Sequence, residues 1–267
     1  MSDPVRFHGV RAALCLAALC SGLACVSPER STVPAEPEAE PHAAPVEQPP
    51  APPVDRSSIA GYSVEGRPIH YSVHGTGSQT ALILASIHGD EAAGTPLLEA
   101  LAEHLDEHPA WTARARVVIV PDLNPDGRAA RTRTNSRGVD LNRNFPAANS
   151  RSAPDALSEP ESAALAELLE RYTPDRVLSI HGWIGLMDWD GPAEALARST
   201  AEHCALPARQ IGARPGSLGS FVGVDKGIPI LTLEMPSSAR RLEQEALWEQ
   251  YGDALLSFIR PPPATGS

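Results

Sequence analysis

The stretch Thr80–Glu91 constrains the fold of this chain more than any other segment. Residues 81–87 form an almost continuous apolar run, and a run of this length predicts a buried strand. The run stops at His88, Gly89 breaks the pattern, and Glu91 precedes a segment with helical spacing. His88 and Glu91 therefore lie just past the carboxyl end of a buried strand, where open α/β sheets place their ligands.

Apolar runs and helical patterns alternate along the rest of the chain. Further strands are expected at 62–64, 69–73, 117–120, 176–180 and 228–233, and helices at 96–105, 158–169, 193–204 and 239–259. Strands that alternate with helices predict an α/β fold. Several connections are too short for a full crossover helix, so we expect a mixed, mostly parallel central sheet with helices on both faces.

Two local patterns refine this prediction. Ser158 and Glu161 have the spacing of a capping box, which would make Ser158 the N-cap of a helix. Residues 124–149 show little periodicity, and a loop this long in a compact domain is usually functional or disordered. Because its sequence is not of low complexity, we expect a functional loop. Its arginines are Arg128, Arg131, Arg133, Arg137 and Arg143.

The N-terminus has the features of an export signal. Arg6 and Arg11 precede the apolar stretch 12–24, which is too short to span a bilayer as a helix. The run Ser21-Gly-Leu-Ala-Cys25 resembles the signal of bacterial lipoproteins, in which Cys25 would carry the lipid. We therefore expect a periplasmic protein that is tethered to a membrane through Cys25. Plain secretion after cleavage at Ala24 is the alternative.

A segment rich in proline and glutamate follows the signal. It has too few apolar side chains to form a core, and its prolines favour extended conformations. The expected organisation is a signal peptide at 1–24, a disordered tether at 25–57, a catalytic domain at 58–262 and a tail at 263–267. The formal net charge of −11 argues against a nucleic-acid partner, because phosphate binding needs a basic face.

Three of the predicted strands end in a titratable residue, namely His88, His181 and Glu234. A single histidine after a strand is more often structural than a ligand, but these three and Glu91 share one edge of one sheet. Two histidines and a glutamate can hold a zinc ion that keeps one position open for water. The remaining carboxylate can then take the proton of that water.

The segments His88-Gly-Asp-Glu91 and Gly138-Val-Asp-Leu-Asn-Arg-Asn-Phe145 resemble signature motifs of the zinc carboxypeptidase (carboxypeptidase A-like) family. The resemblance covers about residues 59–260 and implies a compact version of that family's fold. It also implies one zinc ion, held by His88, Glu91 and His181. Asp90 and His70 would be the next candidates if one of these residues is not a ligand.

The same resemblance implies roles for the loop residues. Asn142 and Arg143 match the pair that holds the terminal carboxylate of the substrate, and Asp140 matches the carboxylate that supports the first histidine ligand. Arg133 matches the arginine that polarises the scissile carbonyl, with Arg131 as the alternative. In the segment Thr-Leu-Glu-Met-Pro236, the glutamate matches the general base; it is Glu234.

Within the family, the likeness is strongest to the murein tripeptide amidases, which cut the γ-D-glutamyl bond to a diamino acid in cell-wall peptides. It rests on the segments Asp188–Pro192, Pro215–Ser220 and Gly227–Pro236. The chain departs from digestive carboxypeptidases because the twenty residues before Glu234 contain no tyrosine; Ser220 and Phe221 are the nearest substitutes.

The resemblance thus implies a zinc metallopeptidase that hydrolyses an amide bond near the carboxyl end of a small cell-wall peptide, with Glu234 assisting zinc-bound water. One alternative is an N-acyl amino acid deacylase of the aspartoacylase or succinylglutamate desuccinylase type, which uses a similar ligand set. Another is a tethered cell-wall-binding module without catalysis. The Asn-Arg-Asn-Phe145 run favours the peptidase.

Overall fold

The computed structural model describes residues 58–148 and 155–260, which belong to one compact unit. The predicted signal, tether and C-terminal tail lie outside the described residues. Among the residues it describes, no helix is both long and apolar enough to cross a membrane.

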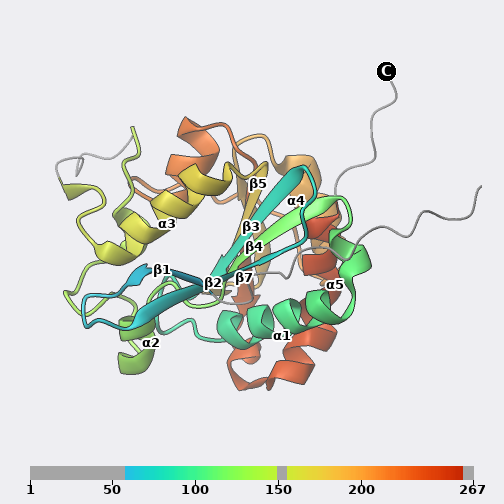
Figure 1. Cartoon of the computed structure of the whole chain (residues 1–267), viewed down its shortest axis with the longest axis horizontal. Coiled ribbons are helices and arrows are strands. Elements are labelled where there is room, and N and C mark those ends of the chain that lie inside the picture. The colour runs from blue at the N-terminus through green and yellow to red at the C-terminus, as the bar shows by residue number, and fades with distance from the viewer. Residues whose placement is uncertain (1–57, 149–154, 261–267) are drawn as a thin grey trace, which may run out of the picture. The chain divides into compact units, whose positions relative to one another are not determined.

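The described residues form a seven-stranded sheet with the order β1-β2-β4-β3-β5-β7-β6 (Figure 1). Four central strands, β4, β3, β5 and β7, run parallel, while β1, β2 and β6 pair antiparallel at the two edges. This confirms the predicted mixed, mostly parallel sheet. The strands are β1 (Ser58–Tyr62), β2 (Pro68–His74), β3 (Gln79–Ala85), β4 (Ala115–Val120), β5 (Arg176–Trp183), β6 (Leu186–Asp190) and β7 (Ile230–Pro236).

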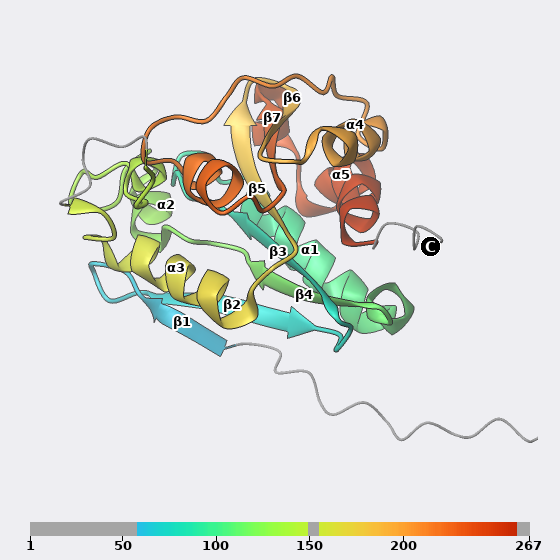
Figure 2. The same cartoon turned by 90° about the horizontal axis from the view of Figure 1, so that it is seen from above.

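Helices cover both faces of the sheet, as a parallel centre requires. The helices α1 (Gly94–Glu107), α4 (Glu194–Glu202) and α5 (Gln244–Ile259) cover one face, and α3 (Pro160–Tyr172) and the π-helical η4 (Gly219–Asp225) cover the other (Figure 2). Ala81, Ile83 and Ala85 of β3 belong to the core under the first group of helices. Leu82 and Leu84 belong to the core under the second group. Alternate residues of one strand therefore belong to two separate cores. The remaining short helices are η1 (Pro109–Thr112), α2 (Pro125–Ala130), η2 (Leu141–Arg143) and η5 (Ser237–Arg241).

The ends of the strands differ from the sequence prediction. The ladder of β3 ends at Ala85, because Ser86 turns into the left-handed region with φ of 53°. By contrast, β5 continues two residues past His181, and β7 continues two residues past Glu234. Both residues therefore lie within their strands and not beyond the strand ends. The strand β6 was not predicted, because its two aspartates interrupt the apolar pattern of a fully buried strand.

The predicted capping box is wrong. The helix α3 begins at Pro160, its N-cap is Glu159, and no side chain of the described residues caps it. Proline is well suited to the first helical position because its missing N–H would be unsatisfied there anyway. Glu161 instead accepts hydrogen bonds from the backbone N–H of Val64 at 3.2 Å and from Asn135 at 3.2 Å.

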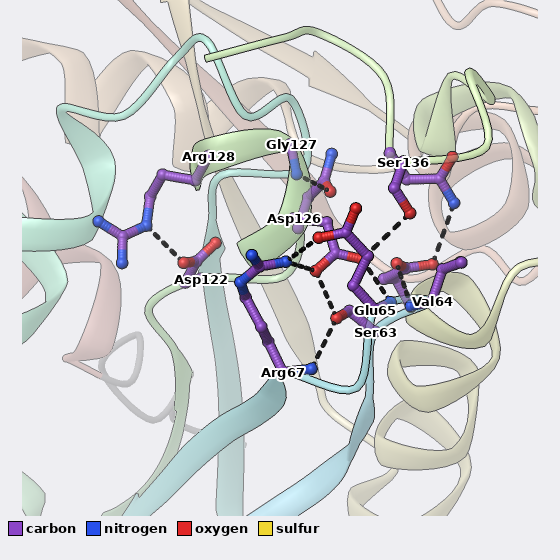
Figure 3. A network of polar contacts seen from close by, with 12 residues as sticks. Ser63, Val64, Glu65, Arg67, Asp122, Asp126, Gly127, Arg128 and Ser136 are labelled. Atoms are coloured by element: carbon purple, nitrogen blue, oxygen red, sulfur yellow. Dashed lines mark hydrogen bonds and ion pairs between the residues drawn. The ribbon is translucent and has the colours of Figure 1, made fainter. Parts of the chain in front are cut away.

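A buried carboxylate connects the β1–β2 turn to α2, which lies within the segment predicted to be irregular. The Asp126 side chain accepts hydrogen bonds from Ser63 Oγ at 2.7 Å, from the N–H of Glu65 at 2.9 Å and from Ser136 Oγ at 3.2 Å (Figure 3). Arg67 forms an ion pair with the same carboxylate. The network fixes α2 against the sheet, next to the turn that carries His88 and Glu91.

Candidate metal centre and active site

Three predicted ligands converge at the carboxyl end of the central strands. Nδ1 of His181 lies 2.9 Å from Oε2 of Glu91 and 3.2 Å from Nδ1 of His88, and Nδ1 of His88 lies 3.0 Å from the same Glu91 oxygen. All three side chains are buried. Among the described residues, they are the group whose ligand atoms all approach within 4.8 Å of one another. Neither Asp90 nor His70 belongs to this group.

The turn that carries two of these ligands is held by the loop before α2. The N–H of Asn124 donates to the carbonyl of Ser86 at 3.1 Å, and its side-chain amide donates to the carbonyl of Ile87. A Cβ on Gly89 would lie 2.0 Å from the backbone of Gly127, so glycine is required at this close approach. The β3–α1 connection is therefore rigid, which presents His88 and Glu91 in a fixed orientation.

The third predicted ligand, His181, and the predicted general base, Glu234, lie side by side on adjacent strands. His181 of β5 pairs in register with Glu234 of β7. Oε2 of Glu234 is buried and has no hydrogen-bond partner among the described residues. Burial, followed by the charge of Glu91, raises the pKa of Glu234 to about 7. A carboxyl group with this pKa is suited to accept and return a proton near neutral pH.

The two glutamates of the site have opposite electrostatics. Burial alone would raise the pKa of Glu91, but hydrogen bonds with His181 and His88 lower it to about 2. Burial lowers the pKa of His181, which favours the neutral imidazole that binds metals. Glu91 is therefore a permanently charged ligand group, whereas Glu234 is able to change its protonation state.

The donor set fits zinc. Two imidazole nitrogens and one carboxylate oxygen are the ligands of many catalytic zinc sites, which keep a fourth position for water or substrate. The other ring nitrogen of His88 lies 3.2 Å from Oδ1 of Asp140, the arrangement that orients histidine ligands in such sites. The unpartnered oxygen of Glu234 adds a proton acceptor at the side of the site.

Of the two candidate arginines, the structure brings Arg133 to the site. Its guanidinium lies 3.5 Å from Oε1 of Glu91 and 3.2 Å from Oδ2 of Asp140, and it is about half exposed. Arg131 is the left-handed residue that ends α2 and makes no side-chain hydrogen bond or ion pair among the described residues. Asn142 and Arg143 follow on η2, where Asn142 Oδ1 accepts from the N–H of Leu218 at 2.9 Å. The Arg143 side chain is exposed.

Asn135 is a buried residue that organises this loop and that the sequence analysis did not single out. Its side-chain oxygen accepts from the N–H groups of Arg137 and Val139, both at 3.1 Å, which closes the turn between Arg133 and Asp140. Its amide donates to Glu159 at 2.7 Å and to Glu161 at 3.2 Å. In the sequence, the one indication of this role is that Asn135 lies between the arginine-rich stretch and the turn at Gly138.

Comparison with known proteins identifies the family. Residues 52–190 match the zinc carboxypeptidase family, and murein peptide amidase A of Escherichia coli (strain K12) is 30% identical over 226 residues, covering 76% of this chain and 89% of that protein. The chain belongs to the zinc carboxypeptidase family. Human carboxypeptidase D is 34% identical over 142 residues, which cover 46% of this chain and 10% of that protein.

Solved structures agree with this zinc carboxypeptidase assignment. The murein-tripeptide amidase from Escherichia coli O157 superposes with a TM-score of 0.62 at 28% identity, covering 78% of this chain and 93% of that chain. A metallo-carboxypeptidase from Burkholderia cenocepacia has a TM-score of 0.62 at 24% identity, covering 77% and 64%, and supports the fold alone. The family uses one zinc ion, and the group of His88, Glu91 and His181 is able to hold it.

Proposed function

We propose that this zinc carboxypeptidase homologue is an amidase that cleaves the γ-D-glutamyl bond to a diamino acid in cell-wall peptides. The observation that carries this proposal is the convergence of His88, Glu91 and His181 beside a buried, unpartnered carboxyl oxygen of Glu234. Similarity to murein peptide amidase A over most of both chains supports the choice of substrate.

Each residue of the site has a separate role in the proposed reaction. Zinc, when bound, would polarise the scissile carbonyl and lower the pKa of water. Glu234 accepts a proton from the attacking water and passes it to the leaving nitrogen as the amide C–N bond breaks. Arg133 stabilises the negative charge that develops on the carbonyl oxygen as water attacks the carbonyl carbon. The exposed fork of Arg143, with the amide of Asn142, holds the terminal carboxylate of the leaving amino acid.

A substrate comparison tests the proposal. The protein is loaded with zinc and incubated separately with three substrates: a γ-D-glutamyl-meso-diaminopimelate peptide, an ordinary peptide with a free carboxyl terminus, and an N-acetyl amino acid. The products are identified by mass spectrometry. Release of free diaminopimelate at the highest kcat/KM is expected. Preference for the N-acetyl amino acid would favour the deacylase alternative, and no hydrolysis with bound zinc would favour a binding module.

We further propose that the enzyme acts outside the cytoplasm. The basic N-terminus, the short apolar stretch 12–24 and the proline-rich segment 25–57 support export and a tether. A lipid on Cys25 would hold the catalytic domain, 58–262, at a membrane surface, within reach of cell-wall peptides.

A further inference from the structure

A pocket of about 660 Å³ lies at the opposite end of the strands from the metal site. It is lined by Gln79, the first residue of β3, by Arg176, the first residue of β5, and by Pro229, which directly precedes β7. These three strands run parallel, so their amino ends lie together, while His181 and Glu234 lie near the carboxyl ends. This amino-end pocket is therefore separate from the candidate active site.

The walls of the amino-end pocket combine an apolar surface with a few polar groups. The helices α4 and α5 lie side by side here (Figure 2), and Pro192, Ala195 and Leu196 supply the apolar part. Ser199 of α4 and Ser257 of α5 also line the pocket, and neither hydroxyl has a hydrogen-bond partner among the described residues. Pockets of about 300–1,000 Å³ with this composition are typical of small-molecule sites.

Arg176 places a buried charge in the amino-end pocket. It is 5% exposed, its Nε donates to the carbonyl of Phe258 at 2.8 Å, and its Nη2 donates to the carbonyl of Ile259. These two bonds cap the last turn of α5. A third bond runs from Nη1 to Oε1 of Gln79 at 3.4 Å. A guanidinium has five N–H groups, so two of them are available to a ligand.

The charges around the amino-end pocket favour an anion. Arg176 forms no ion pair with a carboxylate among the described residues, and burial lowers its pKa, as expected for a cation withdrawn from water. The exposed Arg260 also lines the pocket, with its guanidinium 4.9 Å from the ring centroid of Trp111. Asp175 is the one acid among the described residues of the lining, and its carboxylate accepts the N–H of Thr80 at 2.7 Å. Two arginines and one aspartate therefore leave a positive charge that an anion would compensate.

We propose that the amino-end pocket is a second ligand site, which binds a small molecule with an anionic head group and an apolar body. The head group pairs with the available N–H groups of Arg176 and with Arg260, and the hydroxyls of Ser199 and Ser257 donate to it. The apolar body covers Leu196 and its neighbours on α4. The inference does not depend on the proposed function, because no residue of the metal site takes part.

Another pocket carries the opposite charge and serves as a control. It has a volume of about 470 Å³ and lies between α1 and the beginning of α5, where Ala100 and Trp248 supply apolar surface. Its lining also contains four glutamates, namely Glu103, Glu107, Glu243 and Glu245. This acidic pocket should repel an anion, although its size and its aromatic lining would suit the same probe.

Binding of anilinonaphthalene sulfonate, an amphipathic anion that fluoresces in apolar sites, tests the location. The zinc-loaded protein should bind one molecule per chain. Ala195→Trp, which fills the amino-end pocket from an exposed helix position, should weaken binding at least about tenfold. Ala100→Trp, which fills the acidic pocket, should leave the affinity unchanged, and circular dichroism checks that both variants fold. Failure of the wild-type protein to bind the dye, or wild-type affinity in Ala195→Trp, would overturn the proposal.

A competition measurement with the wild-type protein tests the ligand class and needs no variant. Octanoate and octylammonium have the same apolar body and opposite head groups. Octanoate should displace the dye at a concentration at least about tenfold lower than octylammonium does, the effect of one hydrogen bond to a charged group. Inorganic phosphate should displace it only weakly, because it lacks the apolar body. Equal displacement by octanoate and octylammonium, or by octanoate and phosphate, would overturn the proposed ligand class.

Discussion

Glu91 and Glu234 are chemically identical side chains to which the fold gives different environments. Glu91 lies between two imidazoles, and its pKa falls to about 2 despite burial. Within the described part of the chain, Glu234 has no cationic hydrogen-bond partner, and burial raises its pKa to about 7. One carboxylate is thus suited to bind a cation permanently, and the other is suited to transfer protons. This division follows from their neighbours and not from their sequence context alone.

The ligand assignment predicts the effect of removing a histidine. His88→Ala or His181→Ala should lose zinc and activity together, because three protein ligands leave no substitute. Zinc is measured by elemental analysis after dialysis, with His203→Ala, an exposed histidine on the C-cap of α4, as the control. Full zinc occupancy in the His88 variant would show that the ligand set is wrong.

The candidate site residues could be predicted from the sequence, whereas Asn135, which organises the loop between Arg133 and Asp140, could not. His88, His181 and Glu234 were recognisable because each follows an apolar run, and the ends of parallel strands meet at one edge. Glu91 was recognisable because it lies three residues after His88. Asn135 was not recognisable, since its role depends on acids of α3 that lie 24 and 26 residues away.

At the scale of elements, the cores were easier to predict than the boundaries. Burial on both faces made β3 recognisable, but its last residue depends on the left-handed turn at Ser86, which no periodicity reveals. The edge strand β6 was missed because Asp188 and Asp190 interrupt its apolar pattern. The capping box failed because Pro160 starts α3 and Glu161 serves other partners.

The network around Asp126 predicts how the fold responds to acid. Burial alone would raise the pKa of Asp126, but hydrogen bonds from Ser63, the N–H of Glu65 and Arg67 lower it. Its carboxylate therefore stabilises the fold above the ordinary aspartate pKa of about 3.9, and this contribution is lost as pH falls through the lower folded value. Asp126→Asn should lower the free energy of unfolding by about 1–3 kcal/mol at pH 7.

Denaturant unfolding at a series of pH values checks this prediction. The difference between the wild-type protein and Asp126→Asn should be constant from pH 7 to about pH 5 and shrink below about pH 4. Ser136→Ala, which removes one hydrogen bond of 3.2 Å to the same carboxylate, should have a smaller effect. A difference that grows as pH falls would contradict the role of the charged carboxylate.

At the scale of the whole molecule, we propose that the first 57 residues determine where the enzyme works. If Cys25 carries lipid, the wild-type protein should sediment with membranes, and Cys25→Ser should appear in the soluble periplasmic fraction. Cell fractionation with immunoblotting measures this, and Cys204→Ser, which changes a buried thiol of the folded domain, is the matched control. A soluble wild-type protein would favour plain secretion, and a membrane-bound Cys25→Ser would rule out the lipid anchor.

The central claim is that Glu234 transfers the proton in a reaction at a site built by His88, Glu91 and His181. Its most direct test is the turnover of zinc-loaded Glu234→Gln on the γ-D-glutamyl-meso-diaminopimelate peptide. Glutamine has nearly the same shape but cannot take a proton from water, so kcat should fall by at least about 100-fold in a folded protein with one zinc ion per chain. Near wild-type turnover in that zinc-loaded variant would contradict the account.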